Sequence, residues 1–368
     1  MTEPQTPDVL PAGTVLDGAY RLTRLLGQGG MGSVYEAQHM KAGTRVAVKV
    51  MHRSLASYPE LLARFRREGR VTSDLVHPHV VGVLGSGVAP AGQPYLVMEF
   101  LEGEDLQTRL ERVGALPLET VVQIVNQLAS ALGEAHTGGV VHRDLKPDNV
   151  FLLRVPDGAV FTKLVDFGLS KLLRPEATQL TVTRAVFGTP EFMSPEQAEG
   201  RQEAIDHRSD QWSLACLAWF ASTACLPFSG PDLDAVLNQV ISAVPTPLGP
   251  DAPRLPAEVD KVLRRALSKR RSDRFRTIRA FARAFEAAAS AKARPTPAPP
   301  PRSAAPEAPR APALAAPEAK PEPPPRRRGR WIWLALIAAL AGGAGWLLRH
   351  EPPIWTWLRR ARDVLDGR

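Results

Sequence analysis

Three polar side chains, Asp144, Asn149 and Asp166, stand close together in the sequence and could act on a phosphate. The first two belong to the run VVHRDLKPDNV at 140–150, and Asp166 opens the tripeptide DFG. One carboxylate can orient a hydroxyl nucleophile and accept its proton, while the other carboxylate and the amide oxygen can bind Mg²⁺. The trio predicts phosphoryl transfer to an alcohol, although either run alone could be an Asp/Asn-rich turn between strands.

A glycine-rich run, GQGGMGSV at 27–34, could close over phosphates. The same glycine spacing occurs in dinucleotide-binding folds, where the run opens a helix and an acidic residue follows about twenty positions on. Here two apolar runs, 33–37 and 45–50, follow it and resemble the strands of a hairpin. Glycines on a hairpin let backbone amides approach phosphates unobstructed. We therefore expect a β-hairpin that covers phosphates.

Lys49 stands at the end of the second strand, in the run VAVK. A lysine on a buried strand is costly unless its ammonium group finds a partner. The candidate partner is Glu68, which lies nineteen residues later on a predicted helix at 59–75. Such an ion pair would hold the ammonium group toward the α- and β-phosphates of a nucleotide. The alternative is an edge-strand lysine that reaches solvent.

The elements that must position these residues fall into two parts. Residues 20–102 favour short strands with one helix, whereas residues 105–289 have mostly helical apolar spacing, as in the helix expected over 118–136. We expect a small β-rich lobe followed by a larger helical lobe, with the ligand site between them. The length of 368 residues and the apolar content of 44% exclude a mini-protein or a disulfide scaffold.

The two cysteines and the charge distribution limit the functions further. Cys216 and Cys225 lie in one apolar run, so we expect two buried reduced thiols and no Cys/His metal site. Residues 294–368 carry 13 Lys/Arg against 6 Asp/Glu, whereas the preceding 293 residues carry 33 against 32. The large domain is nearly neutral, so we expect no nucleic-acid partner.

Taken together, these motifs resemble those of the eukaryotic-like Ser/Thr protein kinases, in particular the bacterial transmembrane members, over residues 20–289. The resemblance implies an α+β bilobal fold, with an N-lobe at 20–101 and a C-lobe at 102–289. It also implies that Mg²⁺-ATP is the phosphate donor and that Ser and Thr hydroxyls of proteins are the acceptors. The nucleotide-binding residues that it implies are Gly27, Gln28, Gly29, Gly30, Gly32, Val34, Ala47, Lys49, Met98, Glu99 and Leu101.

The resemblance also assigns roles to the charged residues. Asp144 resembles the catalytic base, and Lys146 resembles the residue that touches the γ-phosphate and favours Ser/Thr over Tyr specificity. Lys49 and Glu68 resemble the activating ion pair. The Mg²⁺ ligands that it implies are Asn149 and Asp166.

An activation segment is expected between Asp166 and Glu196, with Gly188-Thr189-Pro190 receiving the substrate hydroxyl. Arg274 resembles the partner of Glu196, and Asp210 resembles a residue that braces the catalytic loop. The pair Glu191-Phe192 departs from the family, which often has tyrosine second, and this departure bears on substrate fit.

Two threonines of this segment, Thr181 and Thr183, are candidates for activating autophosphorylation. A phosphothreonine would supply about −2 charge to Arg143, the residue before Asp144. A homodimer that phosphorylates in trans is a possible arrangement. The alternative is a pair of solvent-facing threonines in a mobile loop.

The C-terminal region has a different composition. A Pro/Ala-rich basic linker is expected over 290–330, and the uncharged apolar run at 331–348 would span about 27 Å as a helix. We expect one transmembrane helix there, a short tail at 349–368, and a cytoplasmic kinase domain at the inner membrane. A buried core helix or a surface-lying anchor are the alternatives. Residues 1–19 form an N-terminal extension that has no features of a secretory signal.

Two other functions compete with the kinase interpretation. A pseudokinase scaffold would bind nucleotide and partners without turnover, but every charged group that the reaction needs is present. A small-molecule phosphotransferase would share the catalytic Asp and Asn, but is not expected to carry the segment from Gly188 to Glu196.

Overall fold

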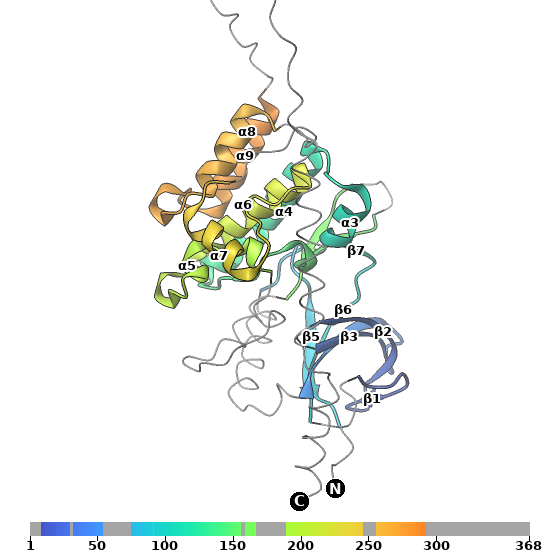
Figure 1. Ribbon diagram of the computed structural model, residues 1–368. Coiled ribbons are helices and arrows are strands. Elements are labelled where there is room, and N and C mark those ends of the chain that lie inside the picture. The colour runs from blue at the N-terminus through green and yellow to red at the C-terminus, as the bar shows by residue number, and fades with distance from the viewer. Residues whose placement is uncertain are drawn as a thin grey trace, which may run out of the picture. The chain divides into compact units, whose positions relative to one another are not determined.

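The computed structural model of the chain describes residues 9–29, 32–53, 75–90, 92–155, 159–166, 189–245 and 255–291 (Figure 1). Its N-terminal part is an antiparallel sheet in the strand order β1-β2-β3-β4-β6-β5. The strands are β1 (Val15–Leu16), β2 (Tyr20–Gly29), β3 (Gly32–His39), β4 (Arg45–Met51), β5 (Val83–Val88) and β6 (Pro94–Glu99). The hairpin expected from the runs 33–37 and 45–50 is therefore confirmed as β3 and β4, and the glycine-rich run begins at the end of β2, which pairs with β3.

Alternation along the strands gives this sheet two different faces. On one face, aromatic and β-branched side chains such as Tyr35, Val48 and Tyr95 form a buried core cluster. Residues that alternate with them point the other way, where Met51, Leu96 and Met98 form a smaller cluster. Lys49 shares the register of this second set, so its position in the strand directs its side chain to the face with the smaller cluster.

The folded part of the sheet begins before Tyr20. Leu16 is buried in the larger cluster, and the backbone amide of Leu10 donates to the Tyr35 hydroxyl at 2.8 Å. The Tyr95 hydroxyl donates to the carboxylate of Asp17. Part of the segment that the sequence suggested as an extension thus adds a strand and two hydrogen bonds to the N-lobe.

The C-terminal part is mainly helical (Figure 1, green to orange). Helix α4 packs against α6 and α9, and the helices bury a single large apolar cluster. A second sheet of three short strands, in the order β7-β8-β9, precedes most of the helices. These elements are β7 (Gly103–Asp105), β8 (Val150–Leu153), β9 (Thr162–Leu164), α3 (Leu106–Val113), α4 (Leu118–Thr137), α5 (Pro195–Ala198), α6 (His207–Thr223), α7 (Leu233–Ser242), α8 (Ala257–Ala266) and α9 (Ile278–Ser290).

Helices α4 and α6 differ in how much of their surface is buried. The helix expected over 118–136 is confirmed as α4, whose apolar residues recur on one face from Val121 to Ala135. Helix α6 is buried along most of its length, and its first half also buries polar residues such as Ser209, Asp210 and Gln211. The central helix of the lobe is therefore α6, and the residues that it carries are held rigidly.

The prediction for the cysteines is half correct. Cys216 lies within α6 and is buried, and this burial raises the pKa of its thiol. Cys225 is exposed, because α6 ends at Thr223 and Ala224 takes a left-handed conformation at the helix C-cap. The apolar run continues past the helix end, which is why the sequence pattern indicated burial at both positions.

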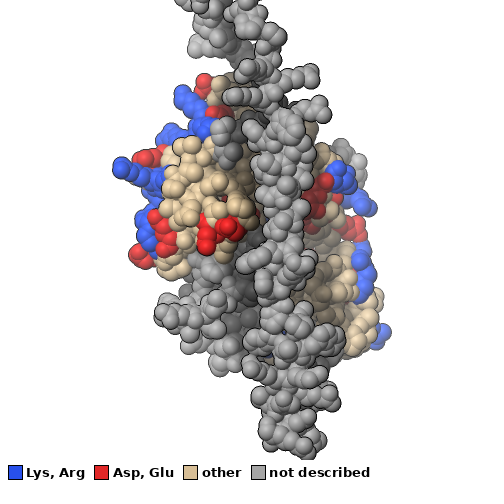
Figure 2. Space-filling view, in the orientation of Figure 1, with Lys and Arg blue, Asp and Glu red and all other residues tan. Residues whose placement is uncertain are grey.

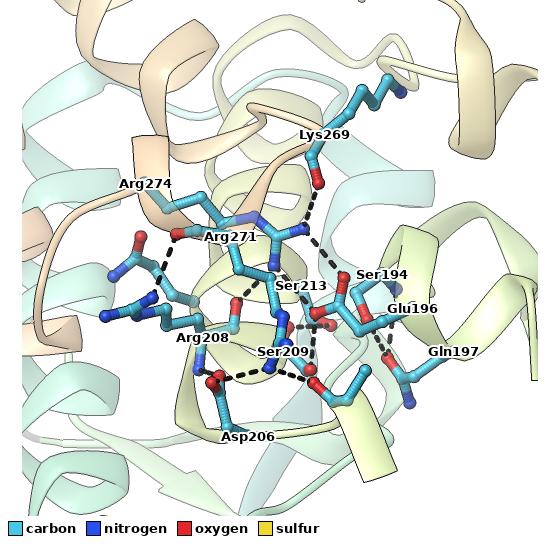
Figure 3. A network of polar contacts seen from close by, with 12 residues as sticks. Ser194, Glu196, Gln197, Asp206, Arg208, Ser209, Ser213, Lys269, Arg271 and Arg274 are labelled. Carbon is cyan, nitrogen blue, oxygen red and sulfur yellow. Dashed lines mark hydrogen bonds and ion pairs between the residues drawn. The ribbon is translucent and has the colours of Figure 1, made fainter. Parts of the chain in front are cut away.

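A buried ion pair fixes the segment before α6 to the C-terminal helices (Figure 3). Both Arg274 terminal nitrogens lie 2.9 Å from the Glu196 carboxylate oxygens, and the Ser209 hydroxyl donates to the same carboxylate at 2.7 Å. The exposed fractions of Glu196 and Arg274 are only 1% and 2%. Burial alone would raise the pKa of Glu196, but the hydrogen bonds and charge of Arg274 outweigh it and the pKa is lowered.

Removing one partner of this pair should destabilise the fold strongly. We expect Arg274→Ala to lower the free energy of unfolding by about 3–5 kcal/mol, because it leaves a buried carboxylate uncompensated. Urea unfolding followed by tryptophan fluorescence measures this, since Trp212 and Trp219 are buried in α6. Arg201→Ala is the control: its pair with Glu199 is exposed, so about 1 kcal/mol or less is expected.

The same pair predicts a pH dependence. Because the folded-state pKa of Glu196 is lowered, its stabilisation is present above the unfolded pKa and is lost as the pH falls through the folded value. The difference in stability between wild type and Glu196→Gln should therefore shrink on acidification. A difference that grows toward acid pH would contradict this assignment.

Candidate active site

Lys49, which is expected to face the phosphates, and Asp166, an expected Mg²⁺ ligand, meet in the structure. The Lys49 ammonium nitrogen lies 2.6 Å from Asp166 Oδ2, although 117 positions separate them in the sequence. Lys49 is 8% exposed, so an unpaired ammonium would be costly at this place. The contact joins strand β4 to the segment that follows β9, and so brings the two parts of the predicted site together.

The two residues that precede Asp166 are fixed by backbone hydrogen bonds. The amide of Val165 donates to the Asn149 carbonyl at 2.9 Å, and Leu164 exchanges backbone hydrogen bonds with His79 and Val81. Asp166 itself has φ of 59°, a left-handed conformation that residues other than glycine rarely adopt. Such strain persists only where the surroundings determine it, and it concentrates at functional sites.

Asn149 orients Asp144. It ends a short 3₁₀ turn, η1 (Pro147–Asn149), and its amide nitrogen donates to the Asp144 carbonyl at 2.7 Å and to Asp144 Oδ2 at 3.3 Å. This use of the nitrogen directs the amide oxygen away from Asp144. Asn149 and Asp166 thus offer oxygen atoms of the kind that Mg²⁺ prefers, and the residues present fit that ion.

Beneath this loop, Asp210 on α6 acts as an acceptor for three groups. It accepts the backbone amides of His142 and Arg143, each at 2.8 Å, and it lies 2.7 Å from His136 Nε2. Burial alone would raise the pKa of Asp210, but the hydrogen bond and charge of His136 lead the effects that lower it. The expectation that Asp210 braces the catalytic loop is confirmed by these contacts.

His142 connects the two halves of the site. Its Nδ1 accepts the Asp144 amide at 3.2 Å, so the proton of a neutral ring lies on Nε2, which contacts the Val165 carbonyl at 3.3 Å. The ring therefore links the residue of the expected base to the residue before Asp166. The sequence contained His142 within a motif but gave no role for it.

An apolar surface lies beside Lys49. Ala47, Leu101 and Val165 are partly buried against the cluster that contains Met98. Val34 pairs with Lys49 across the β3 and β4 ladder, which places it on the same face of the sheet. A flat aromatic base could pack on this surface, and the nucleotide contacts expected at Val34, Ala47, Met98 and Leu101 stay a prediction.

The glycines of the run at 27–34 differ in the space that each leaves for a side chain. A Cβ atom on Gly27 or Gly29 would meet nothing within 4 Å, whereas one on Gly32 would come 2.1 Å from the Val50 carbonyl oxygen. Gly32 is therefore required by the packing of β3 on β4. Gln28 pairs with Ser33 in the ladder, and its side chain lies 3.5 Å from the Ser33 hydroxyl.

The side chain of Glu99 has a role that the sequence did not suggest. Its Oε1 atom accepts the Gly82 amide at 2.7 Å and lies 2.6 Å from the ammonium of Lys163, which also reaches the Val80 carbonyl. This group ties the end of β6 to β9, three residues before Asp166. A signal was present: Lys163, like Lys49, is a lysine in an apolar strand.

The other expected site residues are located as follows. Lys146 is half-buried and precedes η1, two positions after Asp144. Thr189 and Pro190 begin the segment that leads to Gln197, whose side chain donates to the Arg143 carbonyl at 2.7 Å. Residues that lie outside the described part of the chain are Gly30, Glu68, Thr181, Thr183 and Gly188.

Comparison with known proteins identifies the fold. The family model of the protein kinase domain matches residues 20–285. The serine/threonine-protein kinase Pkn1 of Myxococcus xanthus is 42% identical over 272 residues, which are 74% of this chain and 38% of that protein. PknA of Mycobacterium tuberculosis is 38% identical over 279 residues, with 75% and 62% covered.

A solved structure shows the same architecture. The kinase domain of Mycobacterium tuberculosis PknI superimposes with a TM-score of 0.57 at 32% identity, covering 76% of this chain and 100% of that domain. The chain spans 34% to 51% of the length of three Myxococcus relatives, so the similarity concerns the catalytic domain. With its bilobal fold and its 20–285 match, the chain belongs to the protein kinase family, in the bacterial, eukaryotic-like serine/threonine branch.

Proposed function

We propose that the protein transfers the γ-phosphoryl group of ATP to Ser and Thr hydroxyls of protein substrates. The observation that carries the proposal is the contact of Lys49 with Asp166, in a site where Asn149 also orients Asp144. This arrangement holds a cation, two carboxylates and an amide at one place. Phosphoryl transfer depends mainly on such positioning and on the stabilisation of charge.

Each residue has a part in the proposed reaction. The Asp144 carboxylate accepts the proton of the substrate hydroxyl. The hydroxyl oxygen then bonds to the γ-phosphorus, while the bond from that phosphorus to the β,γ-bridging oxygen breaks and ADP leaves. Lys49 turns toward the α- and β-phosphates, and Lys146 toward the γ-phosphate. Asn149 and Asp166 would hold Mg²⁺, which would neutralise charge on the phosphates. The apolar surface of Ala47, Met98 and Leu101 receives the adenine.

Autophosphorylation of Thr181 and Thr183 is proposed as the activating event. The motif agreement with bacterial kinases supports it, as does the place of Arg143 next to Asp144 in the loop that Asp210 holds. A phosphate near Arg143 would supply charge-assisted hydrogen bonds that order the neighbouring chain. Phosphorylation in trans would take place in a homodimer.

Membrane attachment is proposed for the apolar run at 331–348, with the kinase domain in the cytoplasm at the inner membrane. The linker at 290–330 and the tail at 349–368 would flank it. All three segments lie beyond the described residues, apart from Ser290 and Ala291. Among the helices that the structure does describe, none meets the length and hydropathy of a membrane span.

The catalytic role of Asp144 can be tested by a single-atom change. We expect Asp144→Asn to lower kcat for phosphorylation of a basic protein by about 10²–10⁴-fold, because the general base is lost while the shape is kept. The measurement is transfer of labelled phosphate from Mg²⁺-ATP. Asp148→Asn is the matched control, since Asp148 is exposed in the same turn and should retain activity. Equal activity of both variants would show that Asp144 is not the base, whereas no transfer by the wild type would favour a scaffold that binds nucleotide without turnover.

The activation proposal makes a second prediction. Active protein incubated with Mg²⁺-ATP should carry phosphate on Thr181 or Thr183 by mass spectrometry, and the double Thr→Ala variant should phosphorylate substrates at least about tenfold more slowly. Asp144→Asn protein incubated alone should carry none. Bare threonines in fully active protein would show that activation does not require them.

Membrane attachment predicts a fractionation pattern. The full chain should sediment with membranes and resist alkaline extraction, because a spanning helix is not displaced by charge or pH. A chain that ends at Ala291 should remain in the supernatant. Release of the full chain by alkaline carbonate would instead indicate a surface-lying anchor.

A further inference from the structure

Helices α8 and α9 and the loop between them carry a positive charge that the site described above does not use. Residues 255–291 contain ten Lys/Arg and four Asp/Glu. Four of the bases are paired with acids, as Arg264–Asp260, Arg271–Asp206, Arg274–Glu196 and Arg279–Glu134. Six bases and three acids of the segment remain without an ionic partner among the described residues.

Five of these six bases lie at the surface. The sixth, Lys269, is half-buried against the rings of Trp212 and Phe228, and its ammonium group donates to the Val240 carbonyl at 2.6 Å. The other five are exposed, and we call them the α8–α9 basic surface: Lys261, Arg265, Arg270, Arg276 and Arg283.

Packing holds the elements of this surface together. Helix α8 packs against α9. At the end of α8, the Arg265 guanidinium lies 4.3 Å from the centre of the Phe275 ring and donates to the Asp273 carbonyl at 3.4 Å. In Figure 2, Lys and Arg side chains are frequent along the part of the surface that α8 and α9 form. The five bases thus belong to one packed unit of the C-lobe.

The chain continues from α9 into a segment of the same sign. Residues 292–330 contain nine Lys/Arg and three Asp/Glu, and they lead to the apolar run at 331–348 for which a membrane span is proposed. At about 3.5 Å per residue, this linker reaches no farther than about 140 Å when fully extended. Such a tether keeps the α8–α9 basic surface at a high effective concentration beside the bilayer.

An anionic lipid surface fits these bases better than a nucleic acid does. Anionic headgroups attract basic side chains, and each base near the headgroups changes the docking equilibrium by about fivefold. Binding of single-stranded nucleic acid relies on exposed aromatic rings. The aromatic residues of 255–291 are buried, with exposed fractions of 8% or less for Phe275, Phe281 and Phe285. A duplex would be held by charge alone, and the nearly neutral domain offers little long-range attraction to it.

We propose that the α8–α9 basic surface docks the kinase domain onto the anionic lipid headgroups of the membrane to which the chain is attached. The inference rests on the proposed membrane attachment and adds a preferred orientation of the domain to it. A tether alone leaves the domain free to rotate, whereas docking through α8 and α9 turns one side of the C-lobe toward the bilayer.

The test reconstitutes the full chain into vesicles and measures how close α9 lies to the headgroups. Ala287 is exposed one turn after Arg283, so Ala287→Cys places a dye beside the α8–α9 basic surface without removing a charge. Cys225→Ser removes the exposed native thiol, while Cys216 is buried and stays unlabelled. Quenching of the dye by lipids with a nitroxide headgroup is compared between vesicles of phosphatidylcholine alone and vesicles that contain an equal amount of phosphatidylglycerol.

The labelled chain should be quenched at least about twofold more strongly on the phosphatidylglycerol vesicles. The excess should disappear in about 1 M salt, where the Debye length falls to about 3 Å. The triple variant Lys261→Gln, Arg276→Gln, Arg283→Gln should lower the ratio of docked to undocked protein by roughly 10–100-fold, because three attractions of about fivefold each are lost. The linker is unchanged in this variant, so the loss reports on the α8–α9 basic surface alone.

A matched control removes the same charge elsewhere. The changes Arg21→Gln, Lys41→Gln and Arg154→Gln take three exposed bases from the N-lobe and the end of β8, and this variant should keep the excess quenching. Both triple variants should melt at the temperature of the unmodified chain, because the changed side chains are exposed and form no ion pair within the described part of the protein.

Two quenching results would overturn the inference. One is equal quenching on the two kinds of vesicle, and binding of duplex DNA that the Lys261, Arg276 and Arg283 variant loses would then assign the surface to nucleic acid. The other is excess quenching that this variant retains, which would assign the effect to the linker.

Flotation with the same vesicles tests the proposed span separately. A chain that floats only with phosphatidylglycerol, and only while its α8–α9 basic surface is intact, would contradict the span and support the docking surface. A chain that floats with neither kind of vesicle would contradict both.

Discussion

The contact between Lys49 and Asp166 is the constraint on which the site depends. Each residue alone is a poor fit to its surroundings: Lys49 lies on a buried strand, and Asp166 has a left-handed backbone. Their 2.6 Å contact compensates the charge of both and joins the sheet to the segment after β9. An anionic nucleotide with its metal would compete for the same two groups, so the contact holds the pair in place for the ligand.

A second set of contacts, made from the C-lobe, fixes the backbone around Asp144 and Asp166. Asp210 is fully buried in α6 and fixes the backbone on both sides of the His142–Arg143 bond. His142 then bridges Asp144 and Val165. Asp144 and Asp166, the expected base and the expected metal ligand, are therefore positioned from one buried helix through backbone atoms.

Much of the site could be predicted from the sequence, because its reactive residues lie in short runs whose types have few other uses. Asp144, Asn149 and Asp166 are examples. The link between Glu99 and Lys163 could not be predicted in this way, since its partners are 64 positions apart and its geometry depends on the register of β9. Gly32 was assigned to phosphate, but its packing against Val50 appears only when β3 and β4 are paired. Cys225 shows that an apolar run does not reveal where a helix ends.

Average charge was the least informative of the sequence measures. The domain is nearly neutral overall, yet residues 189–245 carry eight acids against two bases, and residues 255–291 carry ten bases against four acids. The two segments neutralise each other through ion pairs such as Glu196–Arg274 and Asp206–Arg271. Because acids and bases of the two segments pair within the lobe, the net charge of the domain does not reveal either segment's charge.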